Sequence, residues 1–245
     1  MSRKSSNTNR GSWLGDDLWS RYLSVTSPES SEALAKIGDI INVDLLLPSW
    51  FKHIIVAATA AIKSQPQDCA AWTRSALNAG ATIDNIFSAA ITLVLSRGIF
   101  PARMLIESLI QVSPKIEMTA SLTPTKDGLS PSKSTIEQYF ISTFNQVPER
   151  VSLLIDECLP AMQTYHMLRN AGLDNTGLTP LQSELLLVAI NAADYKSDYV
   201  LVHAKGARAK GATEAHLVEA CVSVIPFAGV AAWLPASEGI MGSRI

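Results

Sequence analysis

The sequence predicts an all-α protein built from two tandem helical repeats that pack together as a pseudo-twofold unit. Apolar residues recur at helical spacing, and the alternation typical of β-strands is scarce. In addition, residues 50–108 align without a gap on residues 181–239, an offset of 131 positions. Such a repeat usually means that one structural unit is used twice. Because three short helices alone bury little surface, we expect the units to pack against each other.

Four segments are expected along the chain. Residues 1–28 begin with a polar, basic stretch and are predicted to be a disordered tail. Residues 29–110 form the first repeat, which begins with a helix over about 29–41. Residues 111–147 are rich in Pro, Ser and Thr and are predicted to be a linker. Residues 148–245 form the second repeat, and its first helix spans about 148–170 because one apolar stripe runs from Val151 to Tyr165.

Each repeat contains a Gly-Ala-Thr tripeptide, at 80–82 and at 211–213. Glycine suits the left-handed position that ends a helix, and the threonine can cap the next helix. Gly98 and Gly229 are then expected to end the third helix or to let two backbones approach closely. The pattern of each repeat therefore predicts two helices, then a tight turn, then a third helix.

Composition excludes several classes of function. Hydrophobic residues make up 47% of the 245 residues and charged residues 17%, which allows a sizeable core. A net charge of -2 without a basic stripe gives no indication of nucleic-acid binding. The three cysteines form no CxxC pair, which argues against a zinc site or disulfide framework and favours a cytoplasmic location. Pro226 and Gly229 interrupt the apolar stretch 220–236, so we expect a core helix there and no membrane span.

Only the second repeat carries a cluster of polar residues at aligned positions. Its four members are Glu184, Lys196, Tyr199 and His203. The first repeat has His53, Gln65, Asp68 and Trp72 in those places. At 100° per residue, Lys196, Tyr199 and His203 share one helix face, and Asp198 points to the opposite side. Glu184 lies on the preceding helix, whose antiparallel return can bring it beside that face.

Two interpretations of this cluster stay open on the residues alone. A carboxylate, an imidazole, a phenol and an amine that converge on apolar walls can move protons, because histidine titrates near neutral pH. Alternatively, the stripe is a half-exposed helix face with solvated ends. A pocket is expected against the middle helix of the second repeat, with four lining residues: Leu185, Val200, Val224 and Trp233. The remaining residues with reactive side chains are interpreted as structural: His53, His166, His216, Cys69 and Cys221.

The stretch from Glu184 to Trp233 resembles the carboxymuconolactone decarboxylase/alkylhydroperoxidase-D family. Members of that family show a Glu, then a Cys-x-x-Cys twelve residues on, then a His four residues after the second Cys. Glu184 and His203 match the acid and the histidine, and the frame residues Gly211 to Thr213 and Gly229 also match. The resemblance implies two alkylhydroperoxidase-D-like repeats. It also implies a homotrimer, because relatives assemble as rings of six single or three double repeats.

The departures from the family pattern decide which activity is expected. Lys196 and Tyr199 occupy the two cysteine positions, and neither can form a sulfenate or a disulfide, which disfavours thiol peroxidase activity. The decarboxylase branch manages without these thiols. The resemblance thus implies a non-redox lyase (decarboxylase) or isomerase acting on a small carbonyl or carboxylated substrate.

In that reading Glu184 orients His203, while His203 and Tyr199 donate protons. Lys196 holds a carboxylate or enolate, or acts as a Schiff-base nucleophile. The alternative is a catalytically inactive family member that acts as a binding or structural protein. No cofactor, metal or nucleotide is implied, because the sequence has no P-loop, dinucleotide fingerprint or ligand cluster.

Overall fold

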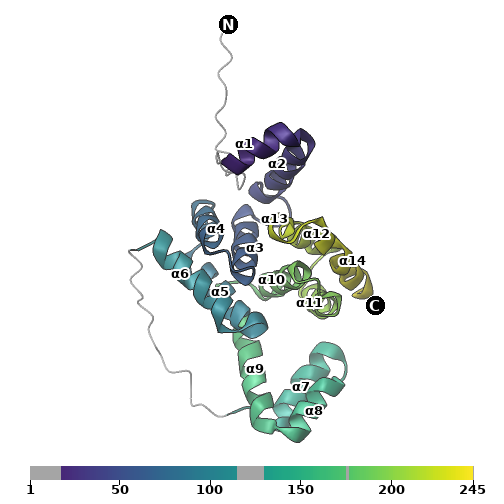
Figure 1. Ribbon diagram of the computed structural model, residues 1–245. Coiled ribbons are helices and arrows are strands. Elements are labelled where there is room, and N and C mark those ends of the chain that lie inside the picture. Colours follow the sequence, from purple (N-terminus) through teal and green to yellow (C-terminus); the bar gives the residue numbers. More distant parts are fainter. Residues whose placement is uncertain (1–17, 115–129, 175–176, 245) are drawn as a thin grey trace.

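The computed structural model describes residues 18–114, 130–174 and 177–244, and within these ranges the chain is helical without any strand (Figure 1). The first unit consists of α1 (Leu18–Thr26), α2 (Pro28–Asn42), α3 (Ser49–Ile62), α4 (Pro66–Asn78), α5 (Ile83–Arg97) and α6 (Ile99–Val112). After α7 (Lys133–Phe144), the second unit comprises α8 (Glu149–Glu157), α9 (Leu159–Leu173), α10 (Pro180–Ala193), α11 (Ser197–Ala209), α12 (Glu214–Val222), α13 (Ile225–Ala228), the 3₁₀ turn η1 (Val230–Ala232) and α14 (Trp233–Gly242). The predicted all-α class is confirmed.

The helix boundaries repeat along the chain with the offset seen in the sequence. Helices α1 to α4 begin and end 131 residues before α8 to α11. Helices α5 and α6 correspond to α12–α13 and to η1–α14, so two continuous helices of the first unit are each interrupted in the second. Pro226, at the start of α13, has no N–H to continue α12. The pseudo-twofold relation between the units stays a prediction.

The turns follow the local signals in the sequence. Gly80 and Gly211 have φ of 105° and 93°, which L side chains rarely adopt. The hydroxyls of Thr82 and Thr213 accept hydrogen bonds from the third amide of α5 and α12. The predicted tight turn between the second and third helices of each repeat is therefore confirmed.

One hydrophobic core joins the two units. Helices α3 and α10 lie at its centre, and every residue of 51–61 and 183–193 is buried. The preceding helices are exchanged between the units, because α9 packs against α5 and α2 packs against α13. Figure 1 shows α1–α2 at one end of the molecule and α7–α8 at the other. Helices α7, α8 and α9 share a smaller separate core that contains Ile136, Phe140 and Met162.

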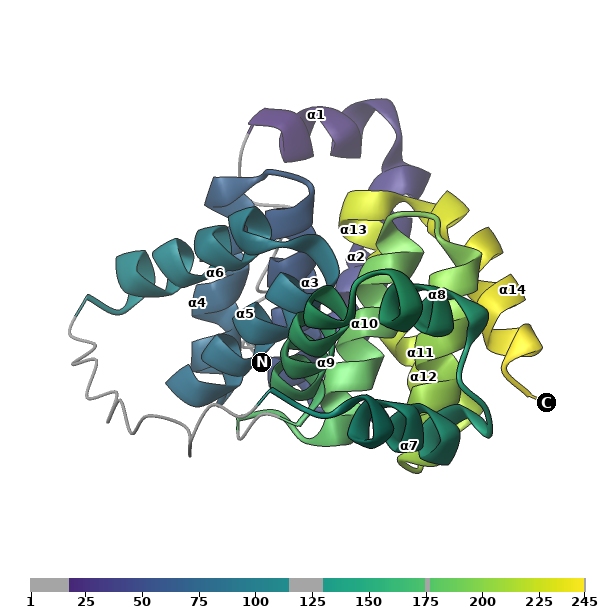
Figure 2. The same cartoon turned by 90° about the horizontal axis from the view of Figure 1, so that it is seen from below.

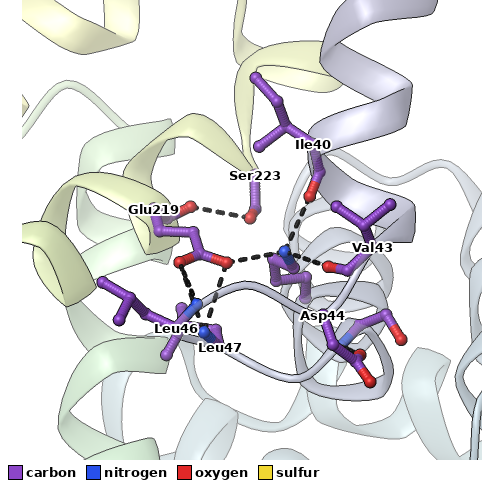
Figure 3. Close-up of polar contacts among 9 residues, drawn as sticks. Ile40, Val43, Asp44, Leu46, Leu47, Glu219 and Ser223 are labelled. Atoms are coloured by element: carbon purple, nitrogen blue, oxygen red, sulfur yellow. Dashed lines mark hydrogen bonds and ion pairs between the residues drawn. The ribbon is translucent and has the colours of Figure 1, made fainter.

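A buried ion pair ties the loop after α2 to α12. Lys52 of α3 is fully buried, and its ammonium donates to Glu219 and to the backbone carbonyls of Ile40 and Val43, each at 2.7 Å. The Glu219 carboxylate also accepts from two loop amides, that of Leu46 at 3.1 Å and that of the following residue at 3.3 Å (Figure 3). Every partner is internal to the fold, so this cluster is a structural clamp.

Three boundaries predicted from the sequence need correction. The predicted tail 1–28 contains α1, and its residues 1–17 lie outside the described part. The predicted linker 111–147 contains the end of α6 and all of α7, whose first turn the Ser132 hydroxyl caps at 3.1 Å. Residues 115–129 lie outside the described part. The single helix expected over 148–170 is two helices, because Pro160 in the first turn of α9 cannot donate to α8.

The apolar stretch 220–236 is divided among α12, α13, η1 and the start of α14. In the described part of the chain, no helix has both the length and the apolar character needed to cross a membrane.

Candidate functional site

A pocket of about 680 Å³ opens between the two units. Its walls come from α5 of the first unit, from α7, and from α8 to α11 of the second unit. Figure 2 shows α9 crossing in front of α10, with α7 and α8 on either side. Apolar side chains, among them Leu95, Phe140, Phe144 and Leu187, alternate with charged ones around the pocket. The mixture suits a small molecule with both an apolar body and polar groups.

Glu184 and His203 form the central polar pair of this site. Glu184 projects from α10 and His203 from α11, and His203 Nδ1 lies 2.8 Å from Glu184 Oε2. Only 5% of Glu184 and 8% of His203 are exposed. Because a carboxylate only accepts hydrogen bonds, Nδ1 is the donor in this contact, and Nε2 is the ring nitrogen left for a ligand. His203 lines the pocket, and its Nε2 bonds to no described residue. The arrangement can take up a proton from a bound molecule and return it.

Gly206 makes this pair possible, and the sequence analysis missed it. It lies one turn after His203 on α11, against the Glu184 carboxylate. A Cβ atom at this position would be 2.5 Å from Glu184 Oε1, far inside contact distance. The only sequence signal was a glycine inside a helix, which usually has a packing reason.

Lys196 and Tyr199 line the same pocket but are exposed at its mouth, Tyr199 to 59%. The structure therefore brings Glu184 and His203 together, with His203 in the pocket wall and Glu184 bonded to it, and leaves the amine and the phenol at the rim. Asp198 also lines the pocket, contrary to the prediction that it points to the opposite side. Lys196 is the N-cap of α11 and its φ of −110° is not helical. The spacing of 100° per residue therefore does not apply between Lys196 and Asp198.

The predicted lining residues are wrong. Leu185, Val200 and Val224 are completely buried in the core, Trp233 belongs to α14, and none of them lines the pocket. The cause is the packing of α14. Its Gly239 lies against Val200, so this side of α11 is covered, and the pocket opens on the side that faces α5 and α9.

Residues 160–239 match the model of the carboxymuconolactone decarboxylase family. This segment, about a third of the chain, is similar to that family. The match begins in α9, ends in α14, and contains both members of the buried pair and both rim residues. The comparison with curated proteins gave no match.

The first unit also contributes to this site. Arg97 of α5 lines the pocket, donates to Asp194 at 2.8 Å, and also bonds to Asn191 of α10 at 2.9 Å. Lys63 reaches the other oxygen of Asp194 at 3.0 Å. Two cations thus share one carboxylate where the units meet, and this compensates the charge of Arg97. Sequence spacing carries no signal for it, because the contact depends on how the units pack.

No cysteine lines the pocket. Burial raises the pKa of Cys221 to about 12, and burial also raises the pKa of Cys69. Both therefore stay protonated at neutral pH and are poor nucleophiles. Cys158 is exposed at the junction of α8 and α9. No group of three His, Cys, Asp or Glu side chains in the described ranges could hold a metal ion.

In the first unit an aromatic pair fills the position equivalent to the Glu184–His203 pair. His53 and Trp72 occupy the aligned sites, and their ring centroids lie 5.2 Å apart. His53 Nε2 bonds to Asn42 at 2.9 Å, and burial lowers the pKa of His53. A neutral histidine against an indole is a packing element, in agreement with the structural role expected for His53. His216 likewise has a structural role, in the capping box of α12.

Proposed function

We propose that this protein is a non-redox small-molecule enzyme, an acid–base lyase (decarboxylase) or isomerase that acts on a small carbonyl or carboxylated compound. The observation that carries the proposal is the buried Glu184–His203 pair, of which His203 lines the pocket. The similarity of residues 160–239 to the carboxymuconolactone decarboxylase family supports the same class.

The proposed chemistry follows from the free Nε2 of His203. In decarboxylation the electrons of the breaking C–C bond move into a neighbouring carbonyl and form an enolate as carbon dioxide leaves. Protonated His203 then gives a proton to the carbon that lost the carboxylate. In isomerisation the neutral imidazole first removes a proton from the carbon beside the carbonyl and then returns it at another position of the enolate. Glu184 stabilises the imidazolium in both cases. Lys196 and Tyr199 act from the rim, where they hold the oxygen that becomes negative.

The pattern of thiols supports a reaction without redox chemistry. A thiol peroxidase needs a reactive thiolate beside its substrate. The two family cysteine positions hold Lys196 and Tyr199, and the pKa of Cys221 is raised to about 12 by burial.

Exposed apolar residues at equivalent positions of the two units support a homotrimer, the assembly that the family resemblance implies. Phe100 is 78% exposed, and Ile99 and Val230, at equivalent positions in the two units, are 64% and 73% exposed. Exposed apolar surface can mark a site of interaction between copies of the chain. Light scattering coupled to gel filtration should give the mass of three chains, and Phe100→Glu should lower it. A monomeric wild type contradicts the trimer.

Proton transfer can be tested without knowing the natural substrate. A set of β-keto acids, carboxylated lactones and their decarboxylated products is incubated in D₂O with the protein and followed by NMR. Carbon dioxide loss, or deuterium incorporation beside the carbonyl, is expected with the wild type.

His203→Gln should reduce the rate by at least ~100-fold, the usual contribution of a general base. His216→Gln, which alters a histidine far from the pocket, is the matched control and should react like the wild type. Equal rates for the His203→Gln variant would overturn the assignment. A wild type that reacts with no compound of the set would favour an inactive binding or structural protein.

A further inference from the structure

Arg169 is a buried cation in the pocket wall, and it forms no ion pair with an acidic residue of the described ranges. It projects from α9, only 4% of it is exposed, and it lines the pocket. Its Nε donates to the Tyr139 hydroxyl at 3.0 Å. Within the described ranges no carboxylate lies at ion-pair distance from it, whereas Arg97 in the same pocket is paired with Asp194. A buried charge without a partner is costly, so the fold maintains this one for a reason.

Aromatic rings fix the position of the guanidinium. Its central carbon lies 5.8, 5.9 and 5.7 Å from the ring centroids of Tyr139, Phe140 and Phe144, all on α7. Cation–π contacts at this distance hold an arginine without neutralising it. Of the five N–H donors of a guanidinium, Tyr139 occupies one. The remaining donors are available to a ligand.

The electrostatic surroundings keep Arg169 charged. Burial by itself would lower the pKa of this guanidinium, but the nearby Tyr139, Tyr165 and Glu184 outweigh it, and the pKa is raised. Arg169 and His203 line the same pocket. An anion bound to Arg169 would therefore lie in the same pocket as the free Nε2 of His203.

We propose that Arg169 is the anion-recognition residue of this pocket and binds the carboxylate of an organic acid. A planar guanidinium pairs with a carboxylate through two parallel hydrogen bonds, a geometry that lysine cannot provide. The apolar body of the acid lies against Phe144 and Leu187, which line the pocket. This inference rests on the proposed function, because it gives the acid–base site an anionic substrate that Arg169 selects.

The proposal has a structural consequence for α7. This helix supplies the aromatic cage, and its own core is small and separate from the main one. A carboxylate on Arg169 restrains the guanidinium and thus the rings around it. Amide hydrogens of residues 136–144 should exchange more slowly when the acid is bound.

The test compares benzoate with its neutral counterpart benzamide, and cyclohexanecarboxylate with its amide. Calorimetry and thermal shift should show that the wild type prefers each acid over its amide by tenfold or more, which is about the loss expected for one charge-assisted hydrogen bond. Arg169→Gln should abolish that preference, and Arg169→Lys should lose most of it. Arg103→Gln, which removes an exposed arginine of α6, is the matched control and should keep it.

The acid-to-amide ratio separates recognition from a purely structural role. If Arg169 only anchors α7, Arg169→Gln lowers the melting temperature and leaves the acid-to-amide ratio unchanged. In that case Tyr139→Phe, which removes the hydroxyl that Arg169 contacts, has the same two effects. Equal binding of acid and amide by the wild type, or no binding of either at millimolar concentration, overturns the proposal.

The His203→Gln variant distinguishes this failure from failure of the proposed function. If that variant prefers acids over amides, recognition by Arg169 stands whatever its catalytic rate. If the wild type turns over a substrate but binds acids and amides equally, only the role of Arg169 is wrong.

Discussion

The clamp between Lys52 and Glu219 leads to a quantitative prediction about stability (Figure 3). The two side chains meet at 2.7 Å, with exposures of 0% and 8%. Removal of one member of a buried ion pair typically costs ~3–5 kcal/mol, because the other charge is left buried without its partner. Glu219→Ala also deprives two loop amides of their acceptor. We therefore expect it to lower the free energy of unfolding by about 4 kcal/mol.

Lys52→Met should cost somewhat less, about 3 kcal/mol, because Glu219 keeps its two backbone amide donors. The double variant Lys52→Met with Glu219→Gln removes both charges together. Its cost should be smaller than the sum of the single variants by about 2 kcal/mol, the coupling typical of residues in direct contact.

Urea unfolding followed by far-UV circular dichroism measures these differences, at one fixed protein concentration because an oligomer gains stability with concentration. Glu107→Ala is the control, since the Arg103–Glu107 pair is exposed on both sides and should contribute less than ~1 kcal/mol. A loss below ~1 kcal/mol for Glu219→Ala, or strictly additive costs in the double variant, would refute the reasoning.

Three further predictions concern single residues. Gly206→Ala places a methyl group 2.5 Å from Glu184 Oε1, so the proposed turnover should fall at least tenfold (~1.4 kcal/mol) with little change in melting temperature; unchanged turnover would contradict this. Cys158 is exposed, whereas Cys221 is buried and burial raises its pKa to about 12. An aromatic disulfide reagent should therefore react with one thiol in the native protein and with three in urea. Rapid reaction of two thiols in the native protein would contradict this prediction. Burial lowers the pKa of His53 below 6.5, so the unfolded chain takes up this proton first as the pH falls. Its contribution to stability is therefore complete above pH 6.5 and decreases below it by up to ~1.4 kcal/mol per pH unit. Urea unfolding from pH 7 to 5 should show a shallower dependence for His53→Phe, and an identical slope would argue against the shifted pKa.

The parts of the fold that could be predicted from the sequence are those determined by residues close together in the chain. Thr82 and Thr213 cap helices through hydrogen bonds from amides three residues on, and a glycine after a helix favours the left-handed conformation. Helix α7 was missed because the prolines and serines around it dominate the composition of 111–147. Its own window carries a serine cap at Ser132 and apolar residues four apart at Ile136 and Phe140. Composition averaged over a long segment concealed a short amphipathic helix.

The site was predictable only where two neighbouring helices of one unit build it. The spacing of Glu184 and His203 on antiparallel helices was sufficient to place them together. Arg97 and Arg169 were not predicted as site residues, because they reach the pocket from α5 and α9, and that packing depends on the exchange between units. The wrong face of α11 was chosen for the same reason, since the position of α14 decides which face is covered.

The exchanged packing also explains how the two copies diverged while the scaffold remained. In the second copy the amide of Gly177 donates to the short hydroxyl of Ser88 at 2.9 Å, and a Cβ on Gly177 would lie 2.1 Å from a backbone oxygen of α5. At the equivalent contact, Leu46 of the first copy faces Glu219 of the second, and the longer carboxylate accepts from the Leu46 amide at 3.1 Å. The small loop residue Gly177 is thus paired with the short side chain of Ser88, and the larger Leu46 is paired with the longer side chain of Glu219. Either member changed alone would leave a steric clash or a buried amide without an acceptor, so each pair had to change together.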